Sequence, residues 1–554
     1  MKIKKITLHN FRSVKEQTFK LKDYSLLIGA NNSGKTNIID ALRIFYEKGK
    51  FDREDIPKFD TDDEESWIEI EFNLTDDEFV NLKDEYRQKN NTLKVRKYLK
   101  SSISDRVRSG QSNIYGYKGS NLSDNLFYGA KNISEAKLGD VVYIPEVAKV
   151  DEYTKLSGPS AFRDSLNFVV KKVKKNSPSF EALSKSFINF NDKFKIETSP
   201  DGTSIQNFID DVNKEIKDWG ISFDLEINQI KPEEVIKHLV SHYLEDKNLK
   251  DKRLYVSSFG QGLQRHLIYT LIRLSTKYKD IPIKKEKKEF TPEFTLILFE
   301  EPEAFLHPAQ QEILNLSLKE LSSENNQQCL ISTHSPLFVS KHIEDVPSIL
   351  KLIKDKAETI IHQVEENSLQ EILKENKELK QILGREITDR DLEEESIRYS
   401  LWLDSERCSA FFADTVLICE GATEKTLIDY LIKNNKISLQ NKQVYILDAM
   451  GKYNIHRYMN LFNKLGIKHS VLSDRDNDSG ENQEVNEFIK KNKNEFTLNM
   501  YSFSKDLENF LGVKSVGRNE RYKKPLNVMW HYKNNKIKQE KVDKLIEIVK
   551  SLID

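Results

Sequence analysis

The chain has 554 residues, of which 38% are hydrophobic and 32% charged, and its formal net charge is −1. This length exceeds what one hydrophobic core usually supports, so we expect two to four domains. The near-zero net charge excludes a uniformly basic protein that coats nucleic acid, although local basic patches remain open. Three cysteines without CxxC spacing exclude a disulfide framework and a zinc cage. We find no secretory signal and no apolar run long enough to cross a bilayer, and therefore expect a cytoplasmic protein with no membrane partner.

The first motif lies in YSLLIGANNSGKTNIIDALRIF, an apolar run followed by a glycine turn and then apolar residues at helical spacing. This pattern predicts a strand, a loop and a helix. Gly29, Gly34, Lys35 and Thr36 fit GxxxxGK[ST], and Asn32 lies inside the same loop. In such a loop backbone N–H groups cradle phosphates, the lysine reaches the terminal phosphates, and the hydroxyl binds Mg²⁺.

Three later segments are typical of the same kind of nucleotide site. TLILFEEPEAFLHPAQQ predicts a buried strand that ends at Glu300, expected in the Mg²⁺ shell, and Glu301, expected to orient the attacking water. QCLISTHSPLFV predicts a second strand ending near His334, whose imidazole could sense the γ-phosphate, although a structural histidine is the alternative. In YVSSFGQGLQRHLIYTLIRL, Ser258 and Gly260 precede a helix and predict a second anion site, or only a turn.

The order of these motifs resembles the ABC-type ATPase heads of the RecF, Rad50 and SMC kind, over residues 1 to about 345. The resemblance implies that the nucleotide is ATP, bound between the heads of two copies, and hence a homo-oligomer joined through the ATPase domains. It also implies that Arg12, in the opening segment NFRS, reaches the nucleotide. Two features depart from this family. Glu300 stands where the family usually has Asp, and SSFGQG, the segment at the position of the family's signature motif, lacks the sequence LSGGQ.

Between the motifs, residues from about 150 to 250 predict a helical insert. FIDDVNKEIKDWG and PEEVIKHLVSHYLED have amphipathic spacing, and VVKKVKKNSPS is basic. A solvated lysine face, a path for DNA and a dimerisation element all remain open. From 346 to 410 the chain is polar and predicts a helical linker, which Gly384 should interrupt.

The second half repeats strand, turn and helix in DTVLICEGATEKTLIDYLIKN, with carboxylates in place of the lysine. Glu420 ends the strand and Glu424 follows one helical turn later, so both face the same mouth. HSVLSDRDND predicts another strand, on which Asp474 and Asp476 share a face and Asp478 continues the row. This all-oxygen set suits two Mg²⁺ or Mn²⁺ ions that act on a phosphodiester. A solvated acidic turn is the alternative.

The carboxylate set resembles a Toprim domain, expected over residues 411–554. SKDLENFLG and RYKKPLN look like further motifs of the OLD-family nucleases, a family that includes the nuclease subunit of Gabija-type anti-phage systems. The resemblance implies that Glu508 helps to bind metal and that a lysine stabilises charge at the scissile phosphate. Of Lys523 and Lys524 we choose Lys524, next to Pro525, and an exposed surface lysine is the alternative. The expected fold is therefore α/β, an ABC-type (RecF/Rad50-like) ATPase domain with a helical insert, followed by a Toprim α/β domain.

These motifs lead us to expect a metal-dependent DNA endonuclease that is coupled to or regulated by ATP, and the resemblance implies a role in anti-phage defence. Two alternatives remain. One is an ATP-sensing scaffold that recruits a partner such as a helicase, and the other is a topoisomerase-like Toprim enzyme, which would need a tyrosine nucleophile.

Overall fold

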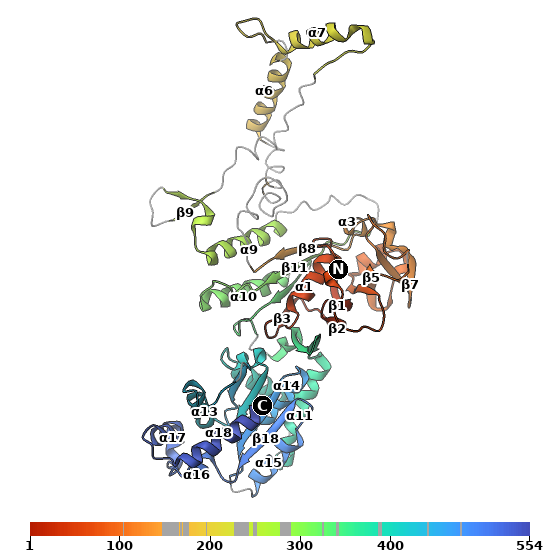
Figure 1. The fold of residues 1–554 in the computed structure, drawn as a ribbon. Coiled ribbons are helices and arrows are strands. Elements are labelled where there is room, and N and C mark those ends of the chain that lie inside the picture. The colour runs from red at the N-terminus through yellow and green to blue at the C-terminus, as the bar shows by residue number, and fades with distance from the viewer. Residues whose placement is uncertain are drawn as a thin grey trace. The chain divides into compact units, whose positions relative to one another are not determined.

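The computed structural model describes most of the chain, and its elements are labelled in Figure 1. The residues outside the description are 104, 147–165, 167–168, 170–176, 195–196, 226–242, 247–251, 278–289, 324–325, 340–342, 386–389, 440–441, 477–478 and 554. The chain divides into two compact units, one made of residues 1–146 with 288–554 and the other of residues 147–287. The first unit holds three sheets.

A largely parallel sheet of six strands carries the nucleotide motifs, in the order β14-β13-β3-β12-β11-β8. Its strands are β3 (Tyr24–Ile28), β8 (Asp140–Ile144), β11 (Thr295–Glu300), β12 (Gln327–Ser332), β13 (Ile349–Asp355) and β14 (Glu358–Gln363). Only β14 runs antiparallel to its neighbour. Buried parallel strands read as continuous apolar runs, which is why YSLLI and TLILF were recognisable.

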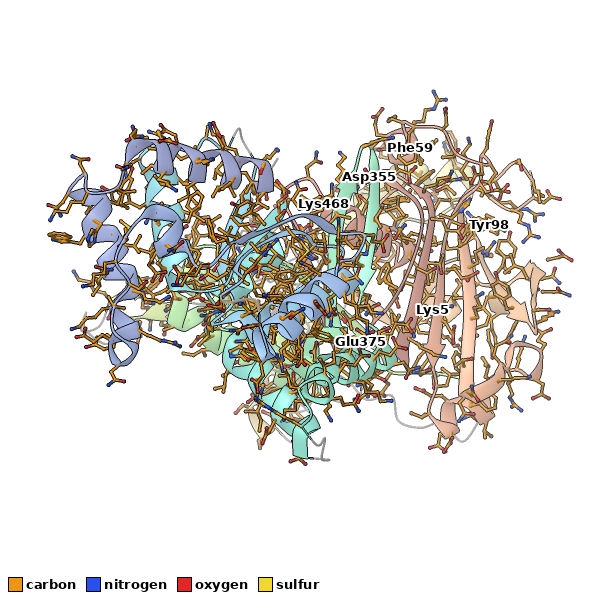
Figure 2. All side chains as sticks on the ribbon, turned by 90° about the horizontal axis from the view of Figure 1, so that it is seen from below. Lys5, Phe59, Tyr98, Asp355, Glu375 and Lys468 are labelled. Carbon is orange, nitrogen blue, oxygen red and sulfur yellow. The ribbon has the colours of Figure 1, made fainter. Side chains whose placement is uncertain are left out.

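A second sheet of six antiparallel strands has the order β2-β1-β4-β5-β6-β7. Its strands are β1 (Lys2–Phe11), β2 (Val14–Lys20), β4 (Ser66–Asn73), β5 (Thr92–Lys100), β6 (Ile114–Lys118) and β7 (Asn121–Leu126). Figure 2 labels Lys5 on β1 and Tyr98 on β5. One hydrophobic cluster joins this sheet to the parallel one through helix α1 (Lys35–Phe45), and it includes Leu8, Ile38, Ile70 and Leu330.

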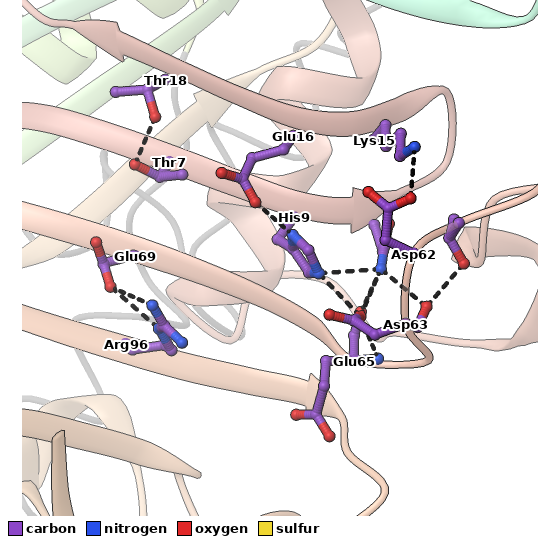
Figure 3. Close-up of polar contacts among 12 residues, drawn as sticks. Thr7, His9, Lys15, Glu16, Thr18, Asp62, Asp63, Glu65, Glu69 and Arg96 are labelled. Carbon is purple, nitrogen blue, oxygen red and sulfur yellow. Dashed lines mark hydrogen bonds and ion pairs between the residues drawn. The ribbon is translucent and has the colours of Figure 1, made fainter.

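Polar networks cross the exposed side of the antiparallel sheet (Figure 3). The His9 ring contacts Glu16 Oε2 at 2.8 Å through Nδ1 and Asp63 Oδ1 at 3.0 Å through Nε2. On the neighbouring strands, the buried Glu69 carboxylate lies 2.8 Å from Arg96 Nη2 and also accepts a hydrogen bond from the Tyr117 hydroxyl. These contacts fix the strand register around the β1–β2 turn, which leads to the nucleotide motifs.

The segment expected to begin a helical linker at residue 346 instead starts with two strands, β13 and β14. That expectation was wrong for residues 349–363, because Lys351 interrupts an apolar run yet is itself buried in the strand. Helices follow from residue 366 onward, α11 (Glu366–Ile382) and α12 (Arg390–Trp402). The predicted interruption at Gly384 is confirmed, since α11 ends just before it and its φ is 65°.

The C-terminal sheet has four parallel strands in the order β16-β15-β17-β18. Its strands are β15 (Thr415–Cys419), β16 (Val444–Asp448), β17 (Lys468–Asp474) and β18 (Thr497–Phe503). Its helices are α13 (Ala422–Lys433), α14 (Ile455–Lys464), α15 (Glu481–Lys491), α16 (Leu507–Leu511), α17 (Lys524–Lys533) and α18 (Gln539–Ile553). The chain passes to β16 on one side of β15 and to β17 on the other, so the carboxyl ends of β15 and β17 flank a topological switch point, where α/β sheets bind ligands.

Shorter elements complete the first unit: α2 (Asp76–Asn81), α3 (Ile133–Ala136) and α10 (Pro308–Ser322). The expected α/β fold, with an ATPase-type sheet first and a parallel sheet after it, is confirmed. Within the described ranges, no helix combines the length and the apolar character that crossing a membrane requires.

The second unit contains α6 (Pro178–Phe194), α7 (Ile205–Ile216), the strand pair β9 (Leu244–Glu245) and β10 (Arg253–Leu254), and α9 (Gln261–Lys277). This unit spans residues 147–287 and is therefore longer than the expected insert of about 150–250. It also includes the turn with Ser258 and Gly260. Helix α7 confirms most of the helix expected from FIDDVNKEIKDWG. Most of PEEVIKHLVSHYLED and of VVKKVKKNSPS lies outside the described residues.

Glu69 provides a test of the antiparallel sheet. Its ion pairs and hydrogen bonds lower the pKa of this buried carboxyl, against the raising effect of burial, so its contribution to stability is present at neutral pH and is lost as the pH falls below the ordinary value of 4.5. We expect Glu69→Gln to lower the free energy of unfolding by about 2 kcal/mol at pH 7. The apparent melting temperature should fall at pH 7, and its difference from wild type should shrink as the pH falls below 4.5. Glu64→Gln, at an exposed ion pair with Lys100, is the control and should change little; an equal loss in both variants would contradict this account.

Candidate functional site

The glycines of the nucleotide loop are required by their surroundings. Gly34 precedes α1 with a φ of 102°, and a Cβ added there would lie 2.3 Å from Thr359 Oγ1. At Gly29, with a φ of 153°, a Cβ would lie 2.3 Å from the Leu352 carbonyl oxygen. Both neighbours belong to the hairpin β13–β14, and Thr359 Oγ1 also donates a hydrogen bond to Ser33 O at 2.9 Å. The hairpin therefore packs against the nucleotide loop and leaves no room for a side chain at Gly29 or Gly34.

Lys35 is held where it can meet a phosphate. Its Nζ donates hydrogen bonds of 3.0 Å to the carbonyl oxygens of Gly29 and Ala30, and burial lowers the pKa of its ammonium to about 8. Thr36 and Asn32 are exposed at the same turn, and Asn32 has a φ of 63°. A glycine-containing turn with a lysine at its mouth and the start of a helix behind it fits a bound phosphate.

Parallel pairing brings the other predicted nucleotide residues to the same edge of the sheet. β12 lies between β3 and β11, so Glu300 and Glu301 at the end of β11 and His334 after β12 follow neighbouring strands. Glu300 Oε2 accepts a 2.6 Å hydrogen bond from the Tyr143 hydroxyl. His334 Nε2 lies 3.5 Å from Glu301 Oε1.

The electrostatics of this edge follow from burial. Burial, followed by the nearby Lys35, lowers the pKa of His334 to about 4, so its imidazole is neutral at pH 7 and its nitrogens can accept or donate a hydrogen bond. Burial, followed by the charges of Glu146 and Glu303, raises the pKa of Glu301. A carboxylate with raised pKa beside a neutral imidazole is suited to orient a water molecule.

Three predicted nucleotide residues have other surroundings. Arg12 Nη1 lies 2.7 Å from Asp40 Oδ2, and its Nε lies 2.7 Å from Asp55 Oδ1. Its guanidinium is thus engaged by carboxylates of the chain. Ser258 and Gly260 are exposed before α9, as expected of a turn at a helix start, but they belong to the unit of residues 147–287.

The second group of predicted residues forms what we call the acidic cluster, at the carboxyl ends of the C-terminal strands. It consists of Glu420, Glu424, Asp474, Asp476 and Glu508. Glu420 follows β15, Asp474 ends β17, and the Asp474 amide donates a 3.0 Å hydrogen bond to Glu420 Oε2. Glu424, in the first turn of α13, accepts a 3.1 Å hydrogen bond from the Gly421 amide. The strand-end geometry that the sequence predicted is therefore present.

Mutual repulsion and burial shape the ionisation of this cluster. Burial, followed by repulsion from Glu424 and Glu420, raises the pKa of Asp474 to about 9. Burial raises the pKa of Glu424 to about 8 and that of Glu420 in the same direction. Groups with these pKa values take up protons unless a cation is brought to them.

Lys452 is a residue of this site that the sequence analysis missed. Its side chain is buried, and its Nζ lies 2.6 Å from Asp476 Oδ2. The loop that carries it follows β16 and is fastened to the cluster, because the Gly451 amide donates a 2.7 Å hydrogen bond to the Glu420 carbonyl. Asp476 itself has a φ of 56°. The one sequence signal was the glycine–lysine pair after the apolar run VYILDAM, a pair that is common in solvent-facing turns.

The two candidate lysines after β18 are distinguished by their partners. Lys524 Nζ lies 3.1 Å from Glu508 Oε1, and the Glu508 side chain is buried. Lys523 instead pairs with Glu520 at the surface. The structure therefore places Lys524, and not Lys523, beside the acidic cluster.

The carboxylates of the cluster are engaged by donors of the chain rather than arranged as a closed cage. In the described part of the chain, no three His, Cys, Asp or Glu side chains are arranged to hold a metal ion. Asp476 faces Lys452 and Glu508 faces Lys524, while Asp478 lies outside the described residues. Asp474 Oδ1, however, is buried and has no hydrogen-bond partner among the residues described. A buried, unpartnered carboxylate oxygen in an all-oxygen donor set fits a hard divalent cation such as Mg²⁺ or Mn²⁺.

Comparisons with known proteins match both parts of the chain. The family described as AAA ATPase domain matches residues 1–339, and the family described as Overcoming lysogenization defect protein-like, TOPRIM domain, matches residues 411–476. The Old nuclease of Escherichia phage P2 is 24% identical over 86% of this chain and 77% of its own length. Endonuclease GajA of Bacillus cereus strain VD045 is 25% identical over 86% of this chain and 75% of its own. The SMC head domain from Thermotoga maritima aligns at 15% identity with a TM-score of 0.31, over 66% of this chain and all of that one.

Asp474 gives a test of the electrostatics of the cluster. Its pKa is raised from 3.8 to about 9, so the wild-type protein loses stability as the pH rises through this window, whereas Asp474→Asn does not carry that cost. In EDTA at pH 8 we expect the variant to have a higher melting temperature than wild type, with a free energy of unfolding larger by about 1–3 kcal/mol. At pH 4 the two proteins should be equally stable. Mn²⁺ should raise the melting temperature of wild type but not of the variant.

The control for this experiment is Asp506→Asn, at a carboxylate that caps α16 outside the cluster. It should lower stability slightly and keep the Mn²⁺ response. A destabilised Asp474→Asn in EDTA at pH 8 would contradict the account.

Proposed function

This chain belongs to the OLD family of ATPase–Toprim nucleases, and on that premise we propose that it is a metal-dependent DNA endonuclease controlled by ATP at its N-terminal domain. The relatives named nuclease and endonuclease support the reaction, and both cover 86% of this chain. The observation that carries the proposal is the burial of Asp474 at the end of β17 and of Glu424 in the first turn of α13, beside the half-buried Glu420 after β15, with Asp474 Oδ1 unpartnered among the described residues. We propose further that the biological role is defence against phage.

In this proposal the residues of the acidic cluster divide the work. Glu420, Glu424, Asp474 and Asp476 hold divalent cations, with Glu508 and Asp478 as further ligands. Bound cations of this kind polarise a phosphodiester and lower the pKa of an attacking water. Lys524 stabilises negative charge at the scissile phosphate, and Lys452 holds Asp476 at the mouth of the site. The close partner of each lysine is a carboxylate, so each ammonium is fixed in position before DNA arrives.

ATP binding is proposed at the loop of residues 29–36, with Glu300 at its Mg²⁺ and Glu301 with His334 at the γ-phosphate. Two copies would join through their ATPase domains, with Ser258 and Gly260 of one facing the nucleotide of the other. An exposed apolar patch beside this edge supports such a contact: Phe305 follows Glu301, and Ile313 and Leu316 lie on α10, all three exposed. We also propose that the protein can bind a helicase-like partner protein.

The nuclease activity is tested with supercoiled plasmid DNA, Mg²⁺ or Mn²⁺, and ATP present or omitted. We expect metal-dependent cutting by wild type and at least about a hundredfold slower cutting by Glu420→Gln and Asp476→Ala, because each loses a cation ligand. Glu481→Gln, at an exposed carboxylate on α15, is the matched control and should cut like wild type. Equal rates in Glu420→Gln and wild type would sink the assignment.

The nucleotide site is tested separately by binding of a fluorescent ATP analogue. Lys35→Ala removes the ammonium held at the loop, so the affinity should fall at least about tenfold. The Mn²⁺-induced rise in melting temperature at the acidic cluster should persist in this variant, since Lys35 begins helix α1 of the ATPase part and is not a residue of the cluster. An unchanged nucleotide affinity would show that the phosphate cradle is wrongly assigned.

A further inference from the structure

Helix α17, labelled in Figure 1, begins at Lys524 beside the acidic cluster and carries an exposed apolar stripe. The stripe consists of Tyr522, Leu526 and Trp530, whose exposed fractions are 73%, 70% and 51%. Leu526 and Trp530, four residues apart, share one face of α17, and Tyr522 lies just before them in the short 3-10 helix Arg518–Lys523 that leads into α17. Large side chains exposed together in this way usually mark an interaction surface.

The segment around the stripe is strongly basic, in a chain whose net charge is −1. Residues 514–538 contain eight Lys and Arg residues and a single acidic residue, Glu520, which gives a net charge of +7. The cations are close to the rings: Lys536 Nζ lies 4.0 Å from the centre of the Trp530 ring, and Lys523 Nζ lies 5.6 Å from that of Tyr522. Aromatic rings interleaved with cations are the pattern of nucleic-acid surfaces.

The stripe is fixed relative to the acidic cluster by the opposite side of the same helix. Val528 is fully buried in the hydrophobic core of the C-terminal domain. Lys524, at the first turn of α17, contacts Glu508 of the cluster at 3.1 Å. Leu526 and Trp530 follow Lys524 within two turns of the same helix but on its other side, so a DNA strand whose scissile phosphate reached Lys524 would meet them by passing around α17.

We infer that this stripe binds the unpaired bases of a DNA strand that flank the scissile phosphate, an inference that rests on the proposed nuclease function. Tyr522 and Trp530 offer ring faces to bases, while the surrounding lysines follow the phosphates. Bases in a duplex already stack on one another, so only unpaired bases have open faces for these rings. A second copy of the chain fits the stripe poorly, because an isologous contact would bring two segments of +7 together.

The test measures binding of fluorescein-labelled oligonucleotides by anisotropy in EDTA, where no cutting occurs. One probe is a single-stranded 30-mer and the other is the corresponding duplex. We expect Trp530→Ala and Tyr522→Ala each to weaken single-strand binding by about tenfold, and duplex binding by much less. Trp530→Phe, which keeps a ring face, should retain most of the affinity. Leu401→Ala, at a residue of α12 that is also 70% exposed, is the control and should bind like wild type.

Tryptophan emission reports the contact directly. The single strand should quench the emission of wild type, and the quench should be smaller in Trp530→Phe even though that variant still binds. Unchanged affinity for both probes in Trp530→Ala, or an equal loss on both, would overturn the inference. A wild type that binds the single strand through the stripe yet cuts no DNA would count against the proposed function and not against this surface.

Discussion

The repulsion between buried carboxylates at the ends of β15 and β17 is the constraint around which the C-terminal domain is arranged. Glu420, Glu424 and Asp474 cannot all ionise in a buried place without a cation, and their raised pKa values express this. Two lysines, the buried Lys452 and the half-buried Lys524, pair with Asp476 and Glu508 and offset part of the charge. Carboxylates with pKa values raised in this way are typical of functional sites.

The hairpin β13–β14 contacts both the ATPase part and this domain. Thr359 on β14 hydrogen bonds to Ser33 in the nucleotide loop, and the neighbouring strand carries Lys351, whose Nζ donates a 2.6 Å hydrogen bond to the Phe411 carbonyl just before β15. On the other side, a Cβ at Gly466 would lie 2.4 Å from the His362 ring. The hairpin thus has close contacts both with the nucleotide loop and with the C-terminal domain.

Much of the fold was readable from the sequence, because buried parallel strands are continuous apolar runs and the glycine loop has a fixed spacing. YSLLI, TLILF and TVLIC all became strands, and the family resemblance is confirmed by the matches to both domains. The hairpin at 349–363 was missed because Lys351 is a buried lysine whose ammonium is satisfied by a carbonyl distant in sequence. Lys452 was missed for the same reason, since its partner Asp476 lies on another strand end. A buried charged residue whose partner is distant in the sequence produces no local sequence pattern that would reveal it.

The most direct test of the central claim is the position of bound manganese. Crystals of the protein soaked in Mn²⁺ would be measured at a wavelength where manganese scatters anomalously. The account predicts a peak within about 2.2 Å of Asp474 Oδ1, with Glu420 or Glu424 as a further ligand. Anomalous peaks only at the nucleotide loop or on the surface, with Asp474 still lacking a cation, would contradict it.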